Sequence, residues 1–95
     1  MISFTVRMTF PQEDRAEIAE ILRALTTASR QEPGCVTYVP HTIHGDPDTV
    51  LIYEQYADKQ ALEAHQHSEH FKRYAVGGLY QKMRDRSRED LLALI

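Results

Sequence analysis

The first ten residues constrain the fold most, because apolar and polar side chains alternate strictly along them. Every second position is apolar: Ile2, Phe4, Val6, Met8 and Phe10. Successive side chains of a strand point to opposite faces, so this pattern predicts a β-strand with one buried face. Pro11 ends the alternation. The chain therefore opens with a strand that needs a hydrophobic layer on one side.

A helix is predicted to follow, because apolar residues then recur at spacings of three and four: Ile18, Ile21, Leu22, Leu25 and Ala28. Asp14 and Glu17 are predicted to form a capping box at its start. Glu32-Pro33-Gly34 is predicted to end it, since the residue before proline resists the helical region.

Two further strands are predicted at 35–44 and 49–56, joined as a hairpin by the turn signal Gly45-Asp46-Pro47-Asp48. The second of them has apolar residues on both faces and is predicted to be buried on both sides.

A second helix is predicted from an Asp58 cap to about His67, and Ser68 is expected to cap a further helical turn that Gly77-Gly78 breaks. Residues 79–86 are read as helical, the charged run 82–90 as solvated, and 90–95 as a short apolar strand. The order βαββαβ predicts an α+β, ferredoxin-like domain over residues 1–95 with an antiparallel sheet.

Helices on one face of a four-stranded sheet leave the other face uncovered. Since strand residues on both faces are partly apolar, we expect a homodimer that buries sheet against sheet.

Composition excludes several classes of protein. The net charge is −3 and no long run of Lys or Arg occurs, so we expect no nucleic-acid partner. No apolar stretch approaches the roughly 20 residues of a membrane span, so no membrane partner is expected. Cys35 is the single cysteine, which excludes an intrachain disulfide and indicates a cytoplasmic protein.

The candidate catalytic residues are Glu54, Tyr56 and His65. Glu54 and Tyr56 share one face of the third strand, and His65 lies on the helix face that looks back at the sheet. A carboxylate that orients an imidazole makes a general base near neutral pH. Tyr38 and Tyr56 are expected to orient a substrate oxygen. The alternative is a buried hydrogen bond that only fixes packing.

Substrate-binding candidates are Tyr38, Ile52, Phe71 and Tyr74, with Phe71 and Tyr74 read first as core. All five histidines fall between positions 41 and 70, but none forms an i,i+4 pair. We therefore expect no metal site. Gly77-Gly78 lacks the spacing of a phosphate-binding loop, so no cofactor is expected.

Five segments in a fixed order carry a family resemblance: Glu32-Pro33-Gly34-Cys35, Tyr38, the stretch 53–58, the stretch 62–65 and the stretch 68–71. The chain resembles the antibiotic biosynthesis monooxygenase (ABM) domain family over nearly its whole length. The resemblance implies a dimeric α+β barrel with a pocket between sheet and helices. It also implies cofactor-independent oxygenation of quinols or polycyclic aromatic ketides. Haem-degrading relatives resemble one another in an Asn, Trp and His set, and this chain has neither Asn nor Trp.

The Tyr53-Glu54-x-Tyr56 run with His65 is also similar to the bacterial isomerase that acts on a phosphorylated autoinducer. The sequence thus leaves three functions open. The first is a cofactor-independent monooxygenase that oxidises a phenolic or quinol-type molecule with O₂. The second is an isomerase of a small, phosphorylated hydroxy-ketone or diketone that works through an enolate. The third is a non-catalytic dimer that binds a small ligand.

Overall fold

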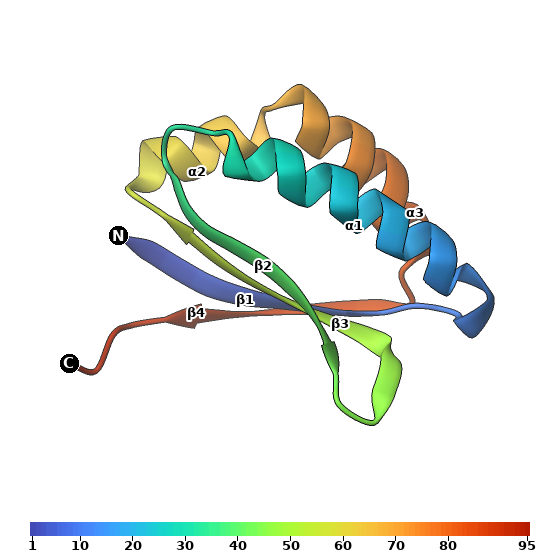
Figure 1. The fold of residues 1–95 in the computed structure, drawn as a ribbon. Helices are drawn as coiled ribbons and strands as arrows, with labels where there is room; N and C mark the ends of the chain where they lie inside the picture. The colour runs from blue at the N-terminus through green and yellow to red at the C-terminus, as the bar shows by residue number, and fades with distance from the viewer.

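The computed structural model, which describes residues 1–95, contains one four-stranded sheet whose helices all lie on the same side (Figure 1). The strands are β1 (Ile2–Thr9), β2 (Cys35–Ile43), β3 (Asp46–Tyr56) and β4 (Asp85–Leu91). They pair antiparallel in the order β2-β3-β1-β4. The helices are α1 (Arg15–Arg30), α2 (Lys59–Gln66), the π-helix η2 (Phe71–Leu79) and the short α3 (Tyr80–Lys82), with a 3₁₀ turn η1 (Gln12–Asp14) before α1. The predicted α+β, ferredoxin-like fold is confirmed.

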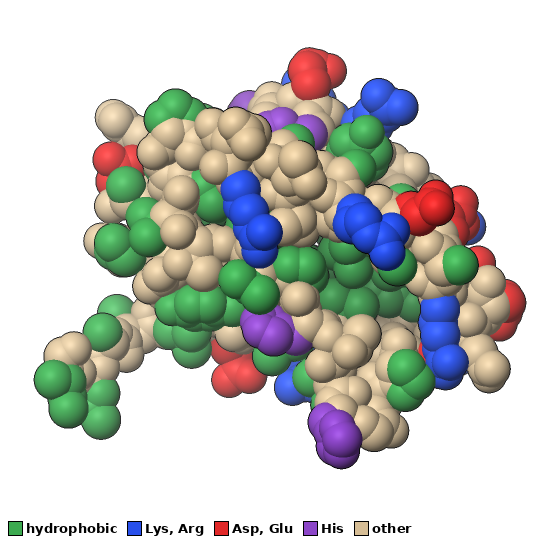
Figure 2. Space-filling model, in the orientation of Figure 1, with side chains coloured by type: hydrophobic (Ala, Val, Ile, Leu, Met, Phe, Trp, Pro, Cys, Tyr) green, Lys and Arg blue, Asp and Glu red, His purple; other side chains and the backbone are tan.

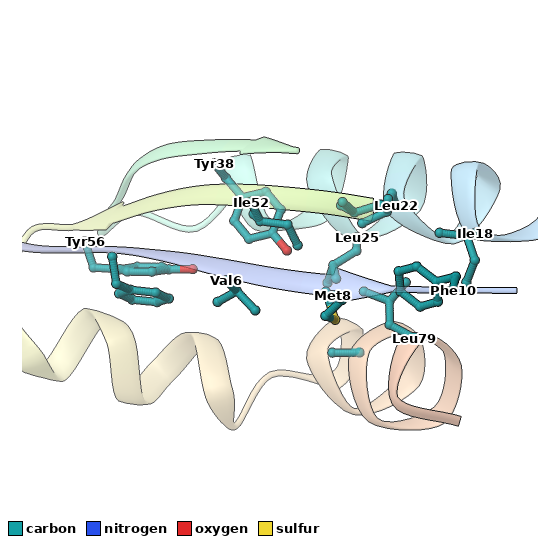
Figure 3. Packing of buried hydrophobic residues seen from close by; sticks show 13 residues of the cluster. Val6, Met8, Phe10, Ile18, Leu22, Leu25, Tyr38, Ile52, Tyr56 and Leu79 are labelled. Atoms are coloured by element: carbon teal, nitrogen blue, oxygen red, sulfur yellow. The ribbon is translucent and has the colours of Figure 1, made fainter. Parts of the chain in front are cut away.

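The core lies between the helices and the sheet. The alternating residues of β1 face it, and Met8 is almost completely buried. Leu25 of α1 and Leu79 at the end of η2 approach Met8 from the helical layer (Figure 3). The apolar residues that recur at every second position in β1, and at every third or fourth position in α1, thus face each other across the two packed layers, as predicted.

The helix starts follow the prediction in two places out of three. Asp58 Oδ1 accepts from the Ala61 N–H at 2.8 Å, and Ser68 Oγ accepts from the Phe71 N–H at 3.2 Å. The capping box at Asp14 is wrong, because the side chain of Asp14 makes no cap hydrogen bond. The 3₁₀ turn η1 already leads the chain into α1, and Glu17 pairs instead with Lys82 at 2.8 Å.

The predicted break at Gly77-Gly78 is also wrong, because η2 runs through both glycines and continues into α3. A Cβ built on Gly78 would lie 3.2 Å from Cγ2 of Ile21. Glycine at this position therefore allows close packing of η2 against α1, and it does not end the helix.

The chain end differs most from expectation. Residues 85–91 form β4, which pairs along β1, whereas 92–95 have no regular structure and the predicted strand at 90–95 is wrong. Helix in 79–86 is limited to the short stretch up to Lys82. Every residue of β4 is exposed, so no hydropathy pattern marks it. Charged side chains are typical of edge strands, which have one side without a partner strand.

β3 shows which face the helices cover. Val50, Ile52, Glu54 and Tyr56 are buried, whereas Leu51, Tyr53 and Gln55 on the other face are only partly buried. The prediction of burial on both sides therefore fails for the single chain, because no helix covers the second face (Figure 1). No helix of the structure combines the length and the apolar character needed to cross a membrane.

Candidate functional site

A polar cluster lies beneath the helical layer, where the sequence predicts it. Glu54 is 6% exposed and His65 is 3% exposed, in a largely apolar interior. β3 turns Glu54 toward the helices, and α2 turns His65 back toward the sheet. The two side chains meet inside one subunit, with His65 Nε2 and Glu54 Oε1 3.8 Å apart.

The carboxylate that orients His65 is Glu32, which the sequence analysis did not select. Nδ1 of His65 lies 2.8 Å from Glu32 Oε2, and the same oxygen is bonded by Nε2 of His70. A carboxylate oxygen accepts, so both imidazoles donate their N–H to it. Glu32 thereby fixes the His65 tautomer and leaves the lone pair on Nε2, which makes no hydrogen bond and faces Glu54.

A close approach of two backbones brings Glu32 to His65. Gly34 stands where β2 begins and abuts Ala61 of α2, so that a Cβ on Gly34 would lie only 2.3 Å from the Ala61 Cβ. Asp58, capping α2 from the end of β3, sets the direction of that helix. Glu32 and His65, 33 positions apart in the sequence, are therefore brought together by packing at a position that only glycine fits.

Tyr56 acts on Glu54. Its hydroxyl donates to Glu54 Oε1 at 2.6 Å, and its side chain is fully buried. Its ring stacks on Phe4 at a centroid distance of 6.1 Å and lies 5.0 Å from the His65 ring. Tyr56 is thus a positioning residue, and its hydroxyl is not free for a substrate.

Burial shifts the proton affinities of the cluster. It raises the pKa of Glu54 to about 7, although the Tyr56 hydrogen bond and the charges of Arg88 and Arg86 act in the opposite direction. Burial also lowers the pKa of His65, although its hydrogen bond to Glu32 acts in the opposite direction. Near neutral pH, His65 is therefore uncharged and able to accept a proton, while Glu54 exchanges between acid and carboxylate.

A cavity of about 60 Å³ adjoins His65 and Glu54. Of the predicted substrate-binding residues, Tyr38, Ile52 and Phe71 line it. Burial raises the pKa of Tyr38, so its phenol keeps the proton that it can donate to a substrate oxygen. Tyr74 is not part of the lining. It lies on the other side of η2, beside α1, with the Arg73 guanidinium 5.1 Å from its ring centroid.

Arg86 and Arg88 of β4 also line this cavity, together with Gln66 and Tyr80. The sequence analysis placed both arginines in a solvated segment. A second, larger hollow of about 240 Å³ lies between α1 and the turn of the β2–β3 hairpin. Its lining contains neither Glu54 nor His65.

Glu32, His65 and His70 are the residues that could hold a metal, since one ligand atom from each lies within 4.8 Å of the others. Two histidines and one carboxylate form a common ligand set for transition metals. Here, however, both imidazole nitrogens point at the same Glu32 oxygen. The three groups are thus linked through hydrogen bonds to Glu32 Oε2, whereas Glu32 Oε1 is buried without a hydrogen-bond partner.

Residues 1–76 match the family described as antibiotic biosynthesis monooxygenase. The chain belongs to the ABM family. Solved structures agree with this assignment. A crystal structure described as antibiotic biosynthesis monooxygenase is 26% identical, with a TM-score of 0.92 and full coverage of both chains. PA3566 from Pseudomonas aeruginosa is 30% identical over 99% of this chain and 94% of its own, with a TM-score of 0.89.

Rv0793 from Mycobacterium tuberculosis, 22% identical, covers 99% of this ABM chain and 95% of its own with a TM-score of 0.88, which shows a shared fold alone. No curated protein matches the chain.

Sequence reasoning missed Glu32, although the Glu32-Pro33-Gly34-Cys35 motif that carries the resemblance contains it. It also missed Arg86 and Arg88. Only a prediction that the charged run forms a strand would have placed both side chains on one face of the sheet. The structure brings Glu54, Tyr56, His65, Tyr38, Ile52 and Phe71 together and leaves Tyr74 apart.

Proposed function

We propose that this ABM protein is a monooxygenase that needs no cofactor and that uses O₂ to oxidise a phenolic or quinol-type molecule. One observation carries the proposal: Glu32 holds His65 Nδ1, so that the free Nε2 faces Glu54 beside an apolar cavity. This arrangement places an oriented base beside a largely apolar cavity, which suits the formation of a phenolate.

In the first step, Nε2 of His65 removes the proton of the substrate hydroxyl. The imidazolium that forms is stabilised by Glu32, which already accepts the Nδ1 proton. The phenolate oxygen can accept a hydrogen bond from the Tyr38 hydroxyl, which lines the same cavity. The protein thereby raises the electron density of the ring, and the ring itself is the reductant.

In the second step, the activated ring carbon forms a bond with O₂ and yields a peroxide. Loss of the hydrogen on that carbon converts C–O–O into C=O as the O–O bond breaks, and the departing oxygen leaves as water with a proton from His65 or from protonated Glu54. A phenol and O₂ thus give a quinone and water, and a quinol gives a hydroxyquinone and water. The balance requires no further oxidant or reductant.

Substrate entry requires side chains to move. A cavity of about 150 Å³ is needed to hold benzene, and the cavity here measures about 60 Å³. The ring of Phe71, whose edge meets Tyr80 at a centroid distance of 6.2 Å, is half-buried. Rotation of these two rings, which both line the cavity, would enlarge the site.

The test is turnover of a panel of phenols and quinols under ¹⁸O₂, with the product analysed by mass spectrometry. The proposal predicts one labelled oxygen in the product and no hydrogen peroxide. His65→Ala should abolish turnover, whereas His67→Ala should not, because His67 is exposed and caps α2 through the Glu63 carbonyl. Thermal unfolding of both variants checks that they fold.

Other outcomes support the other two functions. Turnover of a hydroxy-ketone without oxygen, with solvent deuterium incorporated beside the carbonyl, would establish the isomerase. Ligand binding that is unchanged in His65→Ala, with no turnover of any kind, would establish a binding protein.

We also propose that the domain, residues 1–95, works as a cytoplasmic homodimer that pairs through the uncovered sheet face. Val39, Leu51 and Tyr53 lie on that face. The residues after β4 project from the molecule with apolar side chains, and Leu92 and Leu94 are each 97% exposed (Figure 2). A second copy is the occupant that would cover both features.

Sedimentation equilibrium tests the dimer. Tyr53→Asp should give a monomer, because it places a charge in the proposed interface, whereas Val76→Asp on the exposed side of η2 should leave the mass unchanged. A monomeric wild-type protein at micromolar concentration would contradict this part of the proposal.

A further inference from the structure

We propose that the substrate carries an anionic group, a carboxylate or a phosphate, which Arg86 and Arg88 bind at the mouth of the cavity. This inference rests on the proposed function, because it takes the cavity beside His65 as the place where the substrate reacts.

Both arginines point into the helical side of the sheet. Arg86 pairs with Met8 in the β1–β4 register, and Arg88 pairs with Val6. Met8 and Val6 face the core, so the two arginines lie on the same face of the sheet. The cavity that contains Glu54 and His65 is lined by both. The two arginines thus add positive charge to a cavity whose other lining residues are mostly apolar and include Glu54 and His65.

Aromatic rings hold the two guanidinium groups in place. Arg88 lies 3.8 Å from the centroid of the Phe4 ring, and Arg86 lies 5.6 Å from the centroid of Tyr80. Stacking on a ring fixes the plane of a guanidinium and leaves its N–H groups directed outward along the edge. Two such groups, which come from positions two residues apart on one face of β4, suit bidentate hydrogen bonds with a carboxylate or a phosphate.

The charge of this pair is only partly neutralised. Arg88 donates to Asp90 Oδ1 at 2.8 and 3.0 Å, and the Asp90 side chain is largely exposed. Arg86 makes no ion pair. At neutral pH, His65 is uncharged and Glu54 is partly protonated, so the cavity does not supply a compensating pair of anions. An anionic substrate group would complete the site.

An edge strand often carries charges simply to prevent pairing with other chains. That role accounts for charges directed into solvent, such as Glu89 on the opposite face of β4. It does not account for two arginines on the helical side that stack on Phe4 and Tyr80 and line the cavity. Their position at the mouth allows a substrate to place its anionic group there while its reacting part lies beside His65.

The experiment compares the binding of two matched quinols by calorimetry without oxygen. Hydroquinone is neutral, and gentisate is the same ring with a carboxylate. Hydrogen bonds to a charged group lead us to expect about tenfold tighter binding of gentisate or more. This advantage should shrink as sodium chloride screens the charges. Dihydroxyacetone phosphate is the third probe, because it presents a phosphate on a hydroxy-ketone.

Arg86→Gln and Arg88→Gln should remove the preference for gentisate over hydroquinone. Arg84→Gln is the matched control, since Arg84 is exposed just before β4 and does not line the cavity. Arginine-dependent binding of dihydroxyacetone phosphate in place of gentisate would support the anionic group and identify it as a phosphate. Binding of neither anion at millimolar concentration, or equal binding to wild type and to both variants, would overturn the inference.

Failure of the proposed function looks different. Tight, arginine-dependent binding of gentisate with no oxygen incorporated from ¹⁸O₂ would refute the oxygenase and keep the anion site. Oxygenation of hydroquinone with no preference for an anion would support the oxygenase and refute the anion site.

Discussion

Replacing Glu54 by Gln should remove a specific part of the pH dependence of stability. Burial raises the pKa of Glu54 from its ordinary value of 4.5 to about 7 in the folded chain. Between these two values the folded state binds more protons than the unfolded state, so Glu54 makes stability fall as the pH rises. The difference, at about 1.4 kcal/mol per pH unit, corresponds to about 3 kcal/mol above pH 7.

Gln is nearly isosteric with a protonated Glu, and its side-chain oxygen can still accept from Tyr56. At about pH 5 the variant should therefore be almost as stable as wild type, and at about pH 8.5 it should be more stable by up to about 3 kcal/mol. His65 has the opposite influence, since its lowered pKa makes stability rise with pH through its ordinary value of 6.5. This contribution is present in both proteins and largely cancels in their difference.

Urea unfolding at the two pH values measures the effect, with Glu89→Gln as the control because Glu89 is exposed on β4. The control should show the wild-type pH dependence. A constant difference between wild type and Glu54→Gln across this range would refute the reasoning, because it would mean that Glu54 does not change its proton affinity on folding.

Three further predictions follow from the same contacts. Glu32→Gln should lower kcat more than it raises KM, since it removes the carboxylate that orients His65. It should also move the acidic limb of the pH–rate profile to lower pH, because Glu32 raises the pKa of His65. An unchanged profile would show that the contact only fixes packing. Gly34→Ala should destabilise the protein by about 1–3 kcal/mol, measured as a lower Tm, because the new Cβ would clash with the Cβ of Ala61. Adding Ala61→Gly should restore most of the lost stability. If it restores none, the strain does not come from this contact. Stoichiometric Zn²⁺ should leave the Tm of EDTA-treated protein unchanged, because His65 and His70 already donate to one Glu32 oxygen. A rise in Tm that saturates at one equivalent of Zn²⁺ would show that these residues bind the metal.

The sequence determined the layers of this protein. The alternation in β1 and the apolar stripe of α1 determine which face of each element is buried. Burial of apolar surface is favourable whichever element provides the partner surface. The same logic placed Glu54 and Tyr56 on the helical face of β3 and turned His65 toward them. These are local relations, since one residue or one turn along an element decides which face a side chain occupies.

Tertiary structure alone decided the features that join distant segments. Glu32 reaches His65 because Gly34 lets α2 approach the start of β2, and no periodicity records that approach. β4 carries no hydrophobic signal, because it pairs with β1 through the backbone and none of its residues enters the apolar core. Pairing with β1 sets Arg86 and Arg88 over the cavity. A strand bound through its backbone can have almost any side chains, so only its place in the sheet shows what those side chains face.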